Sequence, residues 1–129
     1  MSTKDLKFTQ KHEWASVSGN IATFGLSDYA QHQFGDIVFI ELPAMGKICT
    51  QGSACANVES VKAVDDMYAP VSGEVIEVNN SLESAPEQIN QEPYGAGWVC
   101  KVKMANPKEL DSLMDDGAYA NYVKSVEEK

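Results

Sequence analysis

The sequence contains no arginine, and its only basic residues are ten lysines. Nineteen acidic residues outnumber them, which leaves a formal net charge of −9. Proteins that bind nucleic acid need a dense basic patch to neutralise phosphates, so a nucleic-acid ligand is not expected. The excess of negative charge instead favours solubility and partners with basic docking surfaces.

Long apolar runs are also missing, and none approaches the roughly 20 residues that a membrane helix requires. Residues 1–5 do not have the pattern of a secretory signal peptide. A chain of 129 residues fits one domain with a modest core, so residues 1–129 are expected to form a single domain. We therefore expect a monomer in the bacterial cytoplasm, without membrane contact, in preference to a processed mitochondrial protein.

Motifs for catalysis or metal binding are scarce. The glycines form no phosphate-binding motif, and no serine lies in a nucleophile context. His12 and His32 are the only histidines, which excludes a histidine-rich metal site. A structural role for His12 is preferred to an acid–base pair with Glu13, because no nucleophile accompanies them. Three cysteines without a CxxC pair are expected to be reduced, buried thiols: Cys49, Cys55 and Cys100. The sequence therefore predicts a non-catalytic protein.

What the chain does contain is a series of short strand-like segments separated by turn residues. The first two strands are expected at 14–17 and 21–24, joined by a Ser-Gly-Asn turn. Ser27 can cap a short helix over 28–34 that ends at Gly35. Further strands are expected at 37–42, at 47–49, on both sides of a tight turn near residue 62, at 74–78 and at 98–104.

The last third of the chain has a mixed pattern. Residues 81–97 are polar and interrupted by proline and glycine, so we expect a surface loop with at most one short helical turn. Residues 98–104 alternate as in a half-buried strand, and Asn106-Pro107 begins a helix. Gly117 is expected to end that helix before a second one over 119–126. About seven short strands with terminal helices indicate a mainly β sandwich covered by helices.

One lysine is isolated from all other basic residues. Lys62 is the only one between Lys47 and Lys101, an interval that holds eight acidic residues. At a hairpin tip, a single amine without basic neighbours suits modification at one site. The alternative is a solvated lysine loosely paired with Asp65 or Asp66, because such exposed ion pairs are common.

The segment Glu59-Ser60-Val61-Lys62-Ala63, followed by Tyr68-Ala69-Pro70-Val71-Ser72-Gly73-Glu74-Val75, resembles the lipoyl-lysine segment of glycine cleavage system H proteins. Four further segments resemble the same family in their order and spacing: 12–14, 25–31, 34–43 and 93–98. The resemblance covers about residues 6–126. It implies a lipoyl/biotinyl-carrier-like β-sandwich, also called a barrel-sandwich hybrid. It also implies lipoate attached at Lys62, with Glu59, Ser60, Val61 and Ala63 forming the attachment hairpin.

The resemblance further implies a carrier with no catalysis of its own. Glycine decarboxylase (P protein) would load an aminomethyl group, and a tetrahydrofolate-dependent aminomethyltransferase (T protein) would remove it. Dihydrolipoyl dehydrogenase (L protein) would reoxidise the arm, and a lipoate-attaching enzyme would install it. A cleft near the attachment site is expected to hold the loaded arm, with Glu13, Gln33 and Asp66 at the matching positions.

Three alternatives remain open. A biotin carrier would place its lysine between methionines, whereas Val61 and Ala63 flank Lys62. A lipoyl domain of a 2-oxo acid dehydrogenase complex usually has an acidic residue directly before its lysine, and here the nearest is Glu59. An H-like protein that serves only as a lipoate relay would have the same attachment segment.

Overall fold

In several strands, apolar residues recur at every second position and give the strand one buried face. In β3 (Ile21–Leu26), Ala22, Phe24 and Leu26 are buried. In β9 (Cys100–Met104), Cys100 and Val102 are buried on the same principle. The computed structural model describes residues 5–127. Residues 1–4, where a signal peptide was excluded from the sequence, and 128–129 lie outside the described residues.

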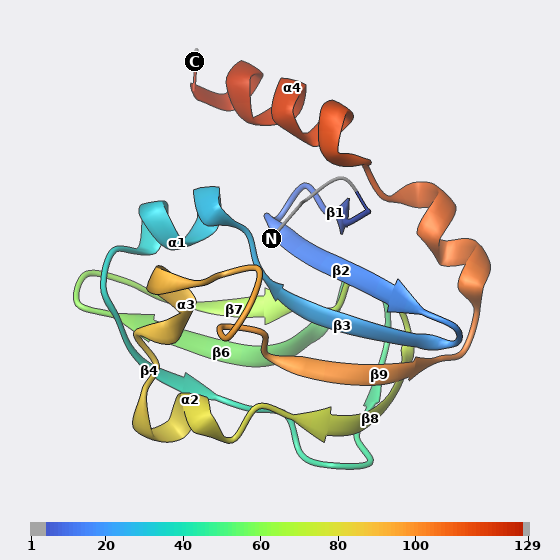
Figure 1. Cartoon of the computed structure of the whole chain (residues 1–129), viewed down its shortest axis with the longest axis horizontal. Coiled ribbons are helices and arrows are strands. Elements are labelled where there is room, and N and C mark those ends of the chain that lie inside the picture. Colours follow the sequence, from blue (N-terminus) through green and yellow to red (C-terminus); the bar gives the residue numbers. More distant parts are fainter. Residues whose placement is uncertain (1–4, 128–129) are drawn as a thin grey trace.

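The strands form two antiparallel sheets (Figure 1). The larger sheet has six strands in the order β1-β2-β3-β9-β8-β5, and the smaller sheet has the order β4-β6-β7. The remaining strand bounds are β1 Lys7–Phe8, β2 Glu13–Ser18, β4 Ile37–Glu41, β5 Ile48–Cys49, β6 Ala54–Ser60, β7 Val64–Tyr68 and β8 Gly73–Val78. This arrangement confirms the mainly β sandwich that the sequence predicts.

The core has two parts. The main cluster lies between the sheets and includes Phe24, Ile40, Val58 and Val102. A smaller cluster, formed by Leu6, Phe8, Trp14 and Tyr119, joins β1 to the C-terminal helix α4 (Asp116–Glu127). The Phe8 and Tyr119 rings are stacked, with centroids 4.2 Å apart. In Figure 1, α4 lies beside β1 and away from the smaller sheet.

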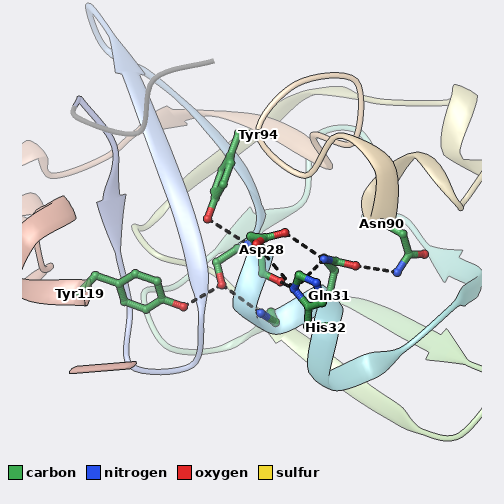
Figure 2. Close-up of polar contacts among 8 residues, drawn as sticks. Asp28, Gln31, His32, Asn90, Tyr94 and Tyr119 are labelled. Carbon is green, nitrogen blue, oxygen red and sulfur yellow. Dashed lines mark hydrogen bonds and ion pairs between the residues drawn. The ribbon is translucent and has the colours of Figure 1, made fainter. Parts of the chain in front are cut away.

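Helix α1 (Asp28–Phe34) forms as predicted, with Ser27 as N-cap and Gly35 at its C-terminal end. Figure 2 shows three side chains from distant segments that reach α1. The Tyr119 hydroxyl lies 2.7 Å from Ser27 Oγ, and the Tyr94 hydroxyl accepts a hydrogen bond from the Asp28 amide. Asn90 Nδ2 donates to Gln31 Oε1 at 2.9 Å. Because its contacts come from three separate segments, α1 is fixed in position.

Three details differ from the expectations. Residues 81–97 contain two short helices, α2 (Ser81–Ser84) and α3 (Gln88–Gln91), because Leu82 and Ile89 are fully buried and anchor them. Val99 is also fully buried, so the expected alternation begins only at Cys100, where β9 starts.

The third difference concerns the C-terminal helices. Pro107–Ser112 is a 3₁₀ helix, η1, capped by Asn106. Gly117 does not end a helix but lies in the first turn of α4. Asp115 starts α4, because its carboxylate accepts from the Ala118 amide at 2.8 Å. Within the described residues, no helix is long and apolar enough to cross a membrane.

Candidate functional site

Lys62 lies at the tip of the hairpin that joins β6 to β7, as expected from the sequence. Residues 61–63 form the turn, and the side chain of Lys62 is exposed. Among residues 5–127, no carboxylate lies within ion-pair distance of its amine. The pairing with Asp65 or Asp66 that the sequence left open is therefore not formed, and the amine is free to react.

Ser60, the last residue of β6, stabilises this turn. Its amide donates to the Ala63 carbonyl at 2.8 Å. Its hydroxyl oxygen accepts hydrogen bonds from the amides of Ala63 at 3.0 Å and Lys62 at 3.3 Å. A serine hydroxyl that binds nearby backbone amides stabilises a local turn without ladder bonds. The tip is thus a defined structure and not a loose loop.

The turn between α1 and β4 supports the hairpin tip from outside. The Val61 amide donates to the Asp36 carbonyl at 3.0 Å. Gly35 has a φ of +78°, which favours glycine, and a Cβ built there would lie 3.2 Å from Lys62 Cε. The stem of Lys62 therefore lies over Gly35 before its amine reaches solvent.

The outer face of the smaller sheet surrounds this tip with apolar and acidic side chains. Phe39, Glu59 and Val64 lie opposite one another on the three strands. Phe39 is 48% exposed and Val64 is 63% exposed, although both are apolar. Glu59 between them is also exposed. This outer face, defined by Phe39, Glu59 and Val64, is the surface next to Lys62.

Glu13, the first residue of β2, lies beside the end of β7 and is only 2% exposed. One carboxylate oxygen accepts from the Thr9 hydroxyl, and the other accepts from the Tyr68 amide at 3.1 Å. Burial raises the pKa of Glu13 above its ordinary value, and the charge of Asp65 raises it further. Glu13 lines a pocket of about 440 Å³, together with Lys11 and Tyr68.

In the structure, Glu13, Gln33 and Asp66 each line a different hollow. Gln33 lines a smaller hollow of about 200 Å³ that also includes Ala63 and Asp65. Asp66 lies opposite Asn57, which donates to its carboxylate at 3.2 Å, and it lines a third hollow.

Asp65 is a second acid near the hairpin tip, next to Asp66, that the sequence analysis did not assign to the cleft. It pairs with fully buried Val58, so its side chain lies on the inner face of the hairpin, whereas Asp66 lies on the outer face. Asp65 lines the hollow of Gln33, and its charge acts on Glu13. The signal that could have found it is the strand period, since Asp65 is two residues from the buried Met67.

The other candidate groups form no second reactive site. The three cysteines are free and buried, as predicted. A neighbouring thiol and burial raise the pKa of Cys49 and of Cys55, so these thiols are poor nucleophiles at neutral pH. His12 is held by the Tyr119 hydroxyl at 2.8 Å, and burial lowers its pKa. In the part of the chain that the structure describes, no group of three or more His, Cys, Asp or Glu side chains could hold a metal ion.

Comparisons with known proteins point to one family. A family model described as "Glycine cleavage H-protein" matches residues 6–126. A "Glycine cleavage system H protein" of Parvibaculum lavamentivorans is 51% identical over 123 residues, which cover 95% of this chain and 98% of the relative. A protein with the same description from Caulobacter vibrioides is 53% identical over 121 residues, which cover 94% and 100%.

A solved structure is similar as well. The crystal structure of a glycine cleavage system H protein from Mycobacterium marinum superposes with a TM-score of 0.86 at 33% sequence identity. The match covers 94% of this chain and 98% of that one. Family model, relatives and solved structure each extend over nearly the whole chain. The chain therefore belongs to the glycine cleavage H-protein family.

Proposed function

We propose that Lys62 carries lipoate as an amide and that this protein shuttles an aminomethyl group between the enzymes of glycine cleavage. The observation that carries the proposal is the free, exposed amine of Lys62 on a turn ordered by Ser60 and Asp36. When bound, lipoate would supply the dithiol that takes up and releases the aminomethyl group. Membership in the H-protein family disfavours a biotin carrier or a lipoyl domain of another complex.

The chain's own residues would present and shelter the arm. The amide bond removes the charge of Lys62, and Val61 and Ala63 place small apolar groups on either side of it. Glu13 would accept a charge-assisted hydrogen bond from the protonated amine of the loaded arm. Glu13 lines a pocket of about 440 Å³ that extends from Tyr68, at the end of β7 far from Lys62, to Ser112 of η1, so the arm would have to lie along β7 to enter it. The charge of Asp65 acts on Glu13 and would add to the attraction for this amine.

The partners proposed are glycine decarboxylase, the aminomethyltransferase, dihydrolipoyl dehydrogenase and a lipoate-attaching enzyme. Each must reach the end of the same arm, so each would approach the hairpin tip. The outer face supports this, since Phe39 and Val64 offer apolar contact and Glu59 offers charge for a basic rim. The named relatives are bacterial proteins, and we propose the bacterial cytoplasm as the compartment.

Substitution of the attachment residue tests the function directly. Lys62→Arg keeps a positive charge, but guanidinium stays protonated and is not an acyl acceptor at neutral pH. The variant should fold with a stability within about 0.5 kcal/mol of the original, because the site is exposed. It should gain no lipoyl mass when lipoate and the attaching enzyme are supplied, and glycine-dependent release of carbon dioxide should be abolished.

Lys47→Arg is the matched control, because it replaces another exposed lysine that lies outside the attachment hairpin, and it should be modified and loaded normally. A lipoylated Lys62→Arg protein would refute the assignment. The lipoate relay is the second candidate function, since it would use the same attachment turn. Efficient lipoylation of the original protein without any glycine-dependent turnover would favour the relay.

A further inference from the structure

The side chain of Asn90 joins α3 to the turn that supports Lys62. Asn90 Nδ2 donates to the Gly35 carbonyl at 2.8 Å and to Gln31 Oε1 at 2.9 Å. Asn90 Oδ1 accepts from the Ile37 amide at 2.9 Å. Both amide protons and the carbonyl oxygen are therefore used, and two of the three bonds go to backbone groups of the same turn.

These backbone groups lie where regular structure is interrupted. Gly35 ends α1 with a positive φ, so its carbonyl has left the helical pattern. Ile37 begins β4, and the pairing of β4 with β6 shifts between Ile37 and Phe39. A backbone group that neither helix nor ladder satisfies needs a side chain or water as partner. Asn90 is the partner of two such groups, the Gly35 carbonyl before Asp36 and the Ile37 amide after it.

Asp36, which lies between Gly35 and Ile37, makes the hydrogen bond to the hairpin tip. The Asp36 carbonyl accepts from the Val61 amide at 3.0 Å. The stem of Lys62 lies against Gly35, as the 3.2 Å approach to a built Cβ indicates. A continuous set of contacts thus leads from α3, through residues 35–37, to the residues on which the amine is presented.

We propose that Asn90 is a positioning residue for Lys62, which fixes the α1–β4 turn and thereby keeps the hairpin tip in the conformation that the lipoate-attaching enzyme recognises. This inference rests on the proposed function of Lys62. If only a fraction of molecules holds the competent tip, the apparent affinity of the attaching enzyme falls by that fraction. The chemical step on a correctly bound lysine is unaffected.

Amide hydrogen exchange tests whether Asn90 keeps the hairpin tip ordered, and it needs no activity assay. In Asn90→Ala, the Val61 amide should exchange about tenfold faster, the factor that loss of roughly 1.4 kcal/mol of local hydrogen bonding produces. Gln91→Ala is the matched control, because Gln91 belongs to the same helix and its side chain is exposed. Exchange at Val61 should be unchanged in that control.

Attachment kinetics test the functional part on the full-length protein, with lipoate, ATP and the attaching enzyme. The KM for Asn90→Ala should rise by the factor by which the competent fraction falls, with kcat unchanged, whereas Gln91→Ala should resemble the original protein. If Asn90→Ala does not fold, Asn90→Asp serves instead. It has the same shape and an acceptor for the Ile37 amide, but its carboxylate cannot donate to Gly35 or Gln31.

Unchanged Val61 exchange in both Asn90 variants would overturn the proposal. Faster exchange with unchanged KM would overturn it as well, because the tip would then be loosened without consequence for recognition. Failure of the function proposed for Lys62 is distinguishable, since the original protein would then remain unmodified at Lys62 whatever the exchange rates are.

Discussion

At the scale of single residues, Glu13 combines burial with negative charge. If its carboxylate holds the amine of the loaded arm, Glu13→Gln should leave lipoate attachment intact, because the oxidised arm has no cation for it to bind. A hydrogen bond to a charged group contributes about 1.5–3 kcal/mol, so even partial loss should release formaldehyde and ammonia several-fold faster. The measurement is the decay of the aminomethylated protein, followed by intact mass.

Two neighbouring carboxylates complete this test. We expect Asp65→Asn to have a larger effect on the decay than Asp66→Asn, because it is the charge of Asp65 that acts on Glu13. Equal and unchanged decay in all three variants would remove these acids from the site. A dominant effect of Asp66→Asn would support the cleft that the sequence predicts.

Burial of Glu13 also makes a prediction about stability and pH. Its pKa is raised in the folded state, so the folded protein binds more protons than the unfolded chain once the pH exceeds about the ordinary value of 4.5. The free energy of unfolding should therefore fall as pH rises through the folded pKa. Glu13→Gln lacks this titration, because an amide carries no ionisable proton.

Urea unfolding at a series of pH values checks the sign. The stability of Glu13→Gln relative to the original protein should increase from below pH 4.5 toward neutral pH and then level off. Its total increase should be about 1.4 kcal/mol for each pH unit by which folding raises the pKa. A difference that stayed constant with pH would mean that the Glu13 pKa is not raised.

The sequence predicts some of these residues and not others for a physical reason. Lys62 is placed by local chemistry, because strand residues on both sides and a short turn between them leave little choice. The face of Asp65 and Asp66 depends on strand parity, and Val64, apolar yet 63% exposed, makes the pattern of β7 ambiguous. A register shift in β6 between Ala54 and Ala56 cannot be read from the sequence at all.

At the scale of elements, α1 and α4 are coupled through one hydroxyl group. Tyr119 Oη lies 2.7 Å from Ser27 Oγ and 2.8 Å from His12 Nδ1, and Ser27 Oγ also caps α1 at the Ala30 amide. Tyr119→Phe and Ser27→Ala should each lower the free energy of unfolding by about 1 kcal/mol. Because they share one network, the double variant should lose less than the sum, by at least about 0.5 kcal/mol.

Denaturant titrations of the two single variants and the double variant measure this coupling. Tyr122→Phe is the matched control in the same helix, since the Tyr122 hydroxyl makes one exposed bond of 3.3 Å to the Gln10 carbonyl. Its loss should cost less than that of Tyr119. Strict additivity of Tyr119→Phe and Ser27→Ala would show that α4 does not support the cap of α1.

Elements set by local signals could be predicted, and elements set by distant contacts could not. Ser27 and Gly35 mark both ends of α1 in the sequence itself. The short helices α2 and α3 depend on the burial of Leu82 and Ile89 under other parts of the fold, which their polar surroundings conceal. The Asn90 contacts to α1 and β4 bridge more than fifty positions along the chain, so no local pattern signals them.

At the scale of the whole molecule, the folded protein and the proposed arm on Lys62 have different roles. The fold contributes a fixed platform, while the arm on Lys62 would contribute reach. Tethering raises the local concentration of the reactive end at each docked enzyme, which relaxes the need for a tight interface. Weak, fast association is then an advantage, and long-range electrostatics supplies it.

The net charge of −9 predicts how loading depends on salt. Attraction to a basic docking surface is screened over about 10 Å at 0.1 M ionic strength and about 3 Å at 1 M. The KM of the decarboxylase for the lipoylated protein should therefore rise several-fold across this range, with kcat nearly constant. Free lipoamide, which is uncharged, should show no such rise and controls for salt effects on the enzyme itself.

A pair of variants that remove one charge each separates local from global electrostatics. Glu59→Gln acts on the outer face beside Lys62, whereas Asp111→Asn acts on η1, which follows β9 and lies at the end of the molecule opposite the β6–β7 turn (Figure 1). The KM should rise more for Glu59→Gln at low salt, and the two variants should converge at high salt because screening removes the difference. If both variants have the same KM at low salt, only the net charge steers docking. If the original protein's KM stays flat across the salt range, electrostatic steering is wrong altogether.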